Sequence, residues 1–281
     1  MLYLSLAITA SLVSSANLAS ASLSYNHTKA DLISEVKSLK PGKPFWVAVR
    51  LTMDKDWHTY WRNPGDSGLS TKIKWTLPEG FVAGETQWPY PHKFKFDGIV
   101  SFGYKDEVCL LTKIRPAKSI EHGGSVSISV KVEWLECKNV CLTGLADLTL
   151  ELPVKDVEPE IDSQWIKQFE AARRNLPLSP SGWKISAMSS KSGFILQLTP
   201  SPGLVSKPTE IFFFPEKSKI IDHATVQEAS RTEAGHVLRL KKSAYALEPT
   251  KRLRGVLVSS TGWLGLDSER ALQIDVPVQY D

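Results

Sequence analysis

The sequence predicts an all-β protein made of two β-sandwich domains. Short runs of alternating polar and apolar residues recur along the chain, and this period of two is typical of half-buried strands. Turns that contain glycine or proline separate the runs. Only the stretch 161–175 has the apolar spacing of a convincing helix. Many short strands between such turns favour a sandwich over an α/β sheet.

Each half of the chain contributes its own set of strands. In the first half we expect them at 45–51, 72–77, 107–114, 125–134 and 146–153. In the second half we expect them at 194–198, 210–214, 236–240, 253–258 and 272–278. The charged segment between the two sets carries Trp165, Phe169 and Ala172 at i, i+4 and i+7, which predicts a short helix in a linker. The expected boundaries are 24–155 for the first domain, 156–182 for the linker and 183–281 for the second domain.

The N-terminus resembles an export signal. Residues 1–23 carry no charged side chain, Leu2 to Val13 is apolar, and Ala19-Ser20-Ala21 fits a small-residue cleavage site. We therefore expect residues 1–21 to be a signal peptide. The usual positive n-region is missing, which leaves an uncleaved anchor or a misplaced start as alternatives. An exported protein works where disulfides persist.

Composition narrows the possible functions. The 281 residues are 42% hydrophobic and 23% charged, with a net charge of +4, as in ordinary globular proteins. Lysine and arginine are scattered among acidic residues, so nucleic acid is not an expected partner. The sequence has no convincing Ser-His-Asp set, carboxylate pair or Gly-rich phosphate loop, so a hydrolase or kinase is not expected.

Two cysteines form the strongest candidate site. Cys137 and Cys141 are separated by a three-residue loop between two predicted strands, which places them opposite each other at a hairpin end. That spacing permits a disulfide. A bond that closes so small a loop constrains the unfolded chain little. The cysteines can therefore be interpreted as a redox-active pair or as a static structural disulfide. A copper or zinc site that also uses His58 is a third interpretation. Cys109 lies in an apolar strand and is expected to be a buried, inert thiol.

Two aromatic segments are candidates for a surface around the cysteines. In the first, 57–68, His58 and Tyr60 share one face of an extended stretch and could line a recognition surface, although core packing is the simpler interpretation of its tryptophans. In the second, 88–98, Phe94 and Phe96 alternate with lysines. They could form a flap over a reactive site, or the segment could be an edge strand protected by its lysines. Trp134 flanks the cysteine pair itself.

Several motifs together resemble a known family. They are Trp57-His-Thr-Tyr-Trp-Arg-Asn-Pro-Gly-Asp-Ser-Gly-Leu69, Trp88-Pro-Tyr-Pro, Tyr104-Lys-Asp-Glu-Val108, Trp134-Leu-Glu-Cys-Lys-Asn-Val-Cys141, Ile211-Phe-Phe-Phe-Pro-Glu216 and Ile221-Asp-His-Ala224. The chain resembles the N-terminal periplasmic region of the DsbD family of thiol:disulfide interchange proteins. The likeness is to the branch associated with suppression of copper sensitivity, and it spans roughly residues 30–280.

The resemblance implies an immunoglobulin-like fold, a periplasmic location and a thiol–disulfide exchange activity without a cofactor. It implies that Cys137 and Cys141 pass electrons to exported thiol or disulfide proteins, as a protein-disulfide reductase does, with Cys141 as attacker. It also implies an aromatic cap, for which Phe94 and Phe96 are the candidates. The membrane and thioredoxin-like domains of the family do not follow the second sandwich, so a membrane electron donor is expected in trans. Neither a metal nor a small-molecule substrate is expected. A non-catalytic binding module and a copper-handling protein remain the alternatives.

Overall fold

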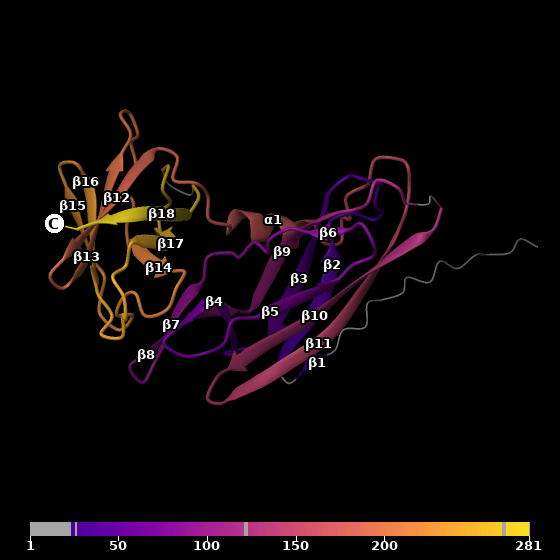
Figure 1. Ribbon diagram of the computed structural model, residues 1–281, viewed down its shortest axis with the longest axis horizontal. Coiled ribbons are helices and arrows are strands. Elements are labelled where there is room, and N and C mark those ends of the chain that lie inside the picture. The colour runs from indigo at the N-terminus through magenta and orange to yellow at the C-terminus, as the bar shows by residue number, and fades with distance from the viewer. Residues whose placement is uncertain (1–23, 26, 121–122, 266–267, 281) are drawn as a thin grey trace, which may run out of the picture.

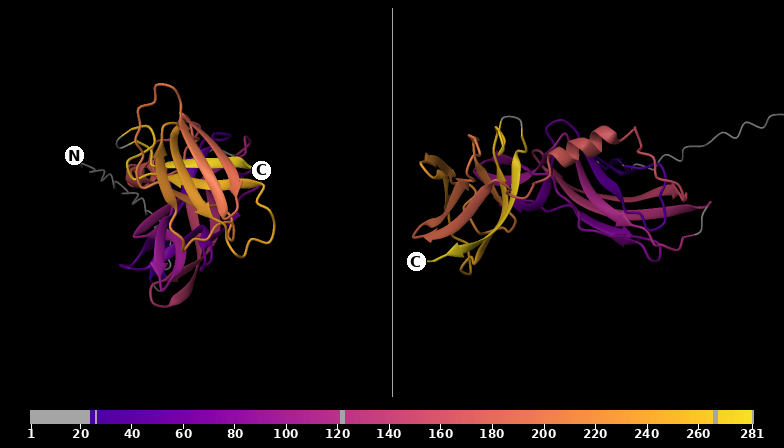
Figure 2. Two further views of the ribbon diagram at one scale, coloured as in Figure 1. Left: turned by 90° about the vertical axis from the view of Figure 1, so that its left-hand side faces the viewer. Right: turned by 90° about the horizontal axis from the view of Figure 1, so that it is seen from above.

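The computed structural model describes residues 24–25, 27–120, 123–265 and 268–280. Two β-sandwiches lie side by side along the long axis of the molecule, and a segment with a short helix connects them (Figures 1 and 2). The predicted all-β, immunoglobulin-like fold is confirmed. The predicted signal peptide lies outside the described residues. None of the helical structure in these residues is both long and apolar enough to cross a membrane.

The first sandwich consists of two facing sheets. One has the strand order β1-β2-β3-β9-β6, with bounds Ser24–Tyr25, Thr28–Ser34, Phe45–Met53, Glu107–Arg115 and Val82–Ala83. The other has the order β11-β10-β4-β8-β7, with bounds Cys141–Pro153, Ser125–Cys137, His58–Gly65, Ile99–Lys105 and His92–Phe96, and β5 (Lys72–Thr76) pairs with β10 beside this path. The strands predicted in the first half are all present within these bounds.

The sequence pattern of each strand reflects which of its faces are covered. On β3, Val47 and Val49 point into the core between the sheets, whereas Ala48 points outward and packs under the helix. On β9, Leu110 faces inward and Leu111 faces the helix. Because both faces of these strands are buried, β9 appears in the sequence as a nearly continuous apolar run.

The helix α1 (Ile166–Arg174) lies within the stretch 161–175 in which a short helix is expected. Ile161 forms an isolated β-bridge with Val36 instead of a helical turn, so the chain reaches the helix only after it has paired with the first sandwich. Phe169 and Ala172 are buried against β3 and β9. The connecting segment is therefore docked on the outside of the first sandwich rather than extended between the two sandwiches.

The second sandwich is built from the strand order β14-β17-β18-β12-β13-β16-β15. Their bounds are Phe212–Pro215, Arg252–Val258, Ala271–Gln279, Trp183–Ser190, Gly193–Pro200, Gly235–Lys241 and Glu228–Thr232. β12 and β18 are joined by a short parallel pairing, and the other pairs are antiparallel. Its own core surrounds the fully buried side chains of Trp263 and Phe213.

Candidate functional site

The two cysteines lie at the tip of the β10–β11 hairpin, whose two strands are labelled in Figure 1. The ladder of this hairpin runs without interruption from Ser125 opposite Pro153 to Cys137 opposite Cys141. At the tip, the Lys138 amide donates a hydrogen bond to the Val140 carbonyl over 3.1 Å, and this closes the turn. The Cα atoms of the two cysteines are 4.2 Å apart and their sulfurs are bonded. The predicted juxtaposition is therefore present, in the oxidised form.

The two cysteine residues differ in their exposure to solvent. Cys137 is 3% exposed, whereas Cys141 is an exposed residue. Thiol–disulfide exchange requires a thiolate to reach a sulfur along the S–S axis, so access decides which sulfur reacts first. In this hairpin an incoming protein thiolate meets Cys141 before it meets Cys137.

His58 flanks the buried cysteine. It lies opposite Cys137 in the β10–β4 ladder, so the two side chains share one face of the sheet. The imidazole stacks on the ring of Phe94, with centroids 4.6 Å apart and planes inclined by 19°. Burial lowers the pKa of His58 below its ordinary value. His58 therefore lies beside Cys137 in the sheet on one side and stacks on Phe94 on the other.

The other aromatic candidates lie in different positions from the predicted surface. Tyr60 is 3% exposed, so it does not line a surface. Its ring packs against the His58 ring in an edge-to-face contact, with centroids 5.2 Å apart. Trp134 is also buried, with its ring packed over Gly144, where any larger residue would clash. Phe96 is 71% exposed at the β7–β8 turn.

The position of Phe96 separates it from the cysteines. It pairs with Ile99 at one end of β8, whereas His58 pairs with Lys105 at the other end. Of the two predicted cap residues, the structure brings only Phe94 to the site. The alternative interpretation of this segment, an edge strand that carries lysines, describes β7 correctly, because β7 is the last strand of its sheet.

Charges around the tip are already paired. The Lys138 ammonium lies 3.1 Å from the Asp56 carboxylate, so it is held across the hairpin tip rather than over the sulfurs. Glu136 is fully buried on the opposite face of β10. Its carboxylate accepts hydrogen bonds from the His27 amide over 3.0 Å and from the Trp134 indole over 3.2 Å. No local pattern of residues indicates that Glu136 is buried and hydrogen-bonded in this way.

Cys109 is free and buried, as predicted. It lies on the outer face of β9, under α1, and lines a cavity of about 170 Å³. Burial raises the pKa of its thiol to about 12, and the neighbouring charge of Glu107 acts in the same direction. A thiol that stays protonated at neutral pH is a poor nucleophile, so Cys109 is unsuited to exchange.

The possibility of a metal site concerns the residues that the structure describes. They contain no cluster of three or more histidine, cysteine, aspartate or glutamate side chains that could hold an ion. His58 lies beside Cys137, but both sulfurs of the pair are bonded to each other and neither is a thiolate ligand in this state.

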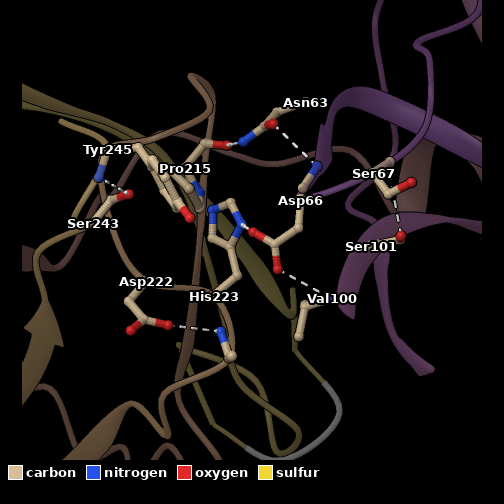
Figure 3. A network of polar contacts seen from close by, with 12 residues as sticks. Asn63, Asp66, Ser67, Val100, Ser101, Pro215, Asp222, His223, Ser243 and Tyr245 are labelled. Carbon is tan, nitrogen blue, oxygen red and sulfur yellow. Dashed lines mark hydrogen bonds and ion pairs between the residues drawn. The ribbon is translucent and has the colours of Figure 1, made fainter. Parts of the chain in front are cut away.

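The aromatic motif 57–69 has a second role that sequence reasoning missed. Its later part, after a β-bulge in β4, contacts the second sandwich. The Asn63 amide donates to the Pro215 carbonyl over 2.7 Å, and the Asp66 carboxylate accepts from His223 Nδ1 over 2.8 Å (Figure 3). Arg62 forms an ion pair with Glu216 at 2.8 Å. The motifs 57–69, 211–216 and 221–224, which are far apart in the sequence, therefore meet at the junction of the two sandwiches.

A family comparison matches the first sandwich. Residues 29–153 match the family model described as thiol:disulfide interchange protein DsbD, N-terminal. The resemblance predicted from the motifs is confirmed over this segment. The first sandwich is therefore similar in sequence to the N-terminal module of thiol:disulfide interchange proteins of the DsbD type. No curated protein matches the sequence at a significant level.

Solved structures extend the comparison to both sandwiches. The crystal structure of the N-terminal periplasmic domain of ScsB from Proteus mirabilis is similar with a TM-score of 0.63 and 18% identity, and the match covers 92% of this chain and 98% of that chain. At this identity the match establishes the fold. BcpA, the major pilin subunit of Bacillus cereus, matches with a TM-score of 0.27, 10% identity and coverage of 90% and 69%. The periplasmic chaperone SfaE matches with a TM-score of 0.22 and 9% identity, and the match covers 89% of this chain and 100% of that chain. Neither of these two scores bears on the present fold or function.

Proposed function

We propose that this protein is a periplasmic thiol–disulfide interchange protein that passes reducing equivalents through Cys137 and Cys141 to exported partner proteins. The observation that carries the proposal is the unequal exposure of the two bonded cysteine residues at the tip of a hairpin, in a segment that matches the DsbD N-terminal family model. An exposed sulfur can be reached by a protein thiol or disulfide, and a buried neighbour can resolve the mixed disulfide.

The reaction has two steps that balance. In the reduced form the Cys141 thiolate attacks one sulfur of a partner disulfide, and a mixed disulfide forms while the partner's other sulfur leaves as a thiolate. The Cys137 thiolate then attacks Cys141, which restores the Cys137–Cys141 bond and releases the partner as a dithiol. Two electrons move to the partner, and a donor protein with a dithiol of its own returns the pair to the reduced form.

Trapping of mixed disulfides tests this proposal. Cys137→Ser leaves the exposed sulfur without its resolver, so this variant should accumulate disulfide-linked partners in a periplasmic extract. Cys141→Ser retains only the buried sulfur and should trap far fewer. A Cys109→Ser background removes the third thiol from both variants. If neither variant forms a mixed disulfide with a thiol protein, the pair is a fixed clip. If the reduced protein instead binds stoichiometric Cu(I) that is lost in both variants, the copper-handling alternative holds.

A further inference from the structure

The second sandwich packs against the same β-hairpin that brings Phe94 to the cysteine pair. Phe102 on β8 is completely buried, with its ring centroid 5.0 Å from that of Phe214 and 4.8 Å from that of His223. Phe214 belongs to the hydrophobic core of the first sandwich although it lies on β14 of the second. The second sandwich thus supplies part of the core beneath β8.

β7 contacts the second sandwich and the redox site through successive residues. The Lys93 ammonium donates to the His223 carbonyl over 3.3 Å and lies 4.9 Å from the ring centroid of Phe212. The next residue, Phe94, stacks on His58. Because successive side chains of a strand point to opposite faces, Lys93 holds one face of β7 on the second sandwich while Phe94 covers the redox site on the other face.

A part-buried polar contact ties the turn end of this hairpin to the same place. Asp66 accepts a hydrogen bond from His223 with one carboxylate oxygen and from the Val100 amide of β8 with the other, over 2.8 and 3.1 Å (Figure 3). His223 is 3% exposed. The segment around His223 therefore contacts β8 through Asp66 and Phe102 and contacts β7 through Lys93.

We propose that the second sandwich positions the aromatic cover of the redox site, with Lys93 as the residue that holds β7 in register for Phe94. β7 is an edge strand that pairs with β8 alone, and four of its five residues are exposed, so little side-chain burial adds to its ladder. The contacts of Lys93 restrict its movement. Phe94 then stays stacked on His58, and the buried sulfur of Cys137 stays covered. The effect on thiol–disulfide exchange rests on the proposed function. The stacking of Phe94 on His58 does not, because it can be measured without any exchange reaction.

The chain offers a matched set of variants for a test. Lys93→Met removes the ammonium and keeps the length of the side chain, and Lys93→Arg keeps a cation that can both donate and lie over the Phe212 ring. Lys95→Met is the control. Lys95 lies on the same face of the same strand, is exposed, and makes no ion pair with any residue that the structure describes.

The first readout is the titration of His58 in the full chain, followed by NMR. Burial lowers the pKa of His58, so loss of the Phe94 cover in Lys93→Met should return that pKa toward its ordinary value. Lys93→Arg and Lys95→Met should titrate as the unsubstituted protein does. If Lys93→Met and Lys95→Met give the same His58 titration curve, the inference is wrong.

The second readout is the attack of glutathione on the disulfide, with the site of the adduct assigned by mass spectrometry. Lys93→Met should raise the share of adduct on Cys137 by roughly two- to five-fold, which is the population change that a contact of this kind is worth. Lys93→Arg should restore the original share. If exchange is rapid but the share of adduct on Cys137 is unchanged in Lys93→Met, the proposed function stands and the positioning role of Lys93 is wrong. If exchange is slow in every variant but the His58 titration changes in Lys93→Met, the positioning role of Lys93 stands and the proposed function is wrong.

Discussion

His58 lies directly opposite Cys137 in the ladder between β4 and β10, and its ring stacks on the ring of Phe94 from β7. The buried cysteine thus has a neighbour in the adjacent strand that stacks on a residue of a further strand, whereas Cys141 is an exposed residue. The proposed function uses this asymmetry, with the exposed cysteine as the attacker and the buried one as the resolver.

Burial of His58 predicts that the protein loses stability on mild acidification. The pKa of His58 is lowered in the folded protein by desolvation, so the unfolded chain takes up a proton first as the pH falls. Folding stability therefore decreases as the pH falls below about 6.5, the ordinary pKa of histidine. Burial also lowers the pKa of His92 and of His236, so these two histidines contribute to the same loss of stability.

His58→Phe isolates the contribution of His58, because it keeps a ring that can stack on Phe94. Urea denaturation at a series of pH values between 5 and 8 should give a shallower decrease in the free energy of unfolding for His58→Phe than for the unsubstituted protein. Equal slopes for the two proteins would show that His58 is not desolvated in the folded state.

Glu136 is predicted to be important for stability although it faces away from the sulfurs. Glu136→Ala leaves the His27 amide and the Trp134 indole without their acceptor in a buried place, at a cost of roughly 2–3 kcal/mol in the free energy of unfolding. Glu133→Ala, at an exposed position of the same strand, should change it by less than about 0.5 kcal/mol. Chemical denaturation of both variants measures the difference, and similar values would contradict the buried hydrogen bonds.

Cys109 is expected to stay unmodified in the folded protein. Its thiol is buried and its pKa is raised to about 12, so iodoacetamide at pH 8 should alkylate the reduced native protein at Cys141 and, more slowly, at Cys137. Cys109 should react only after urea is added. Mass spectrometry of the alkylated peptides distinguishes the three sites. Modification of Cys109 at the rate of Cys141 in the native state would contradict its position under α1.

Local patterns were sufficient to predict the strands and the cysteine pair. The alternation of 125–134 and 146–153, with a short loop between the cysteines, is a local signal, and the β10–β11 ladder follows it. The short helix lies inside the stretch 161–175, but its start at Ile166 could not be predicted, because the pairing of Ile161 with Val36 is a tertiary contact that the helical period of the sequence does not reveal. The same limit applies to Phe96, whose alternation with Phe94 gave no information on which end of the hairpin lies at the cysteines.

The junction of the two sandwiches could not be predicted from local patterns. Asn63 and Asp66 look like ordinary turn residues in the sequence, and their partners lie more than a hundred residues away at Pro215 and His223. Only the folded chain shows that the motif around Asn63 and the motif around His223 serve one contact.

The reduction potential of the Cys137–Cys141 pair tests the central claim most directly. The protein is equilibrated in graded glutathione buffers, and the free thiols are then alkylated and counted, with Cys109→Ser as the background. We predict a potential within the range of exchange proteins, roughly −120 to −270 mV, with rapid equilibration. A potential below about −300 mV with slow exchange would show that the bond is a structural clip, and would contradict the function proposed for this protein.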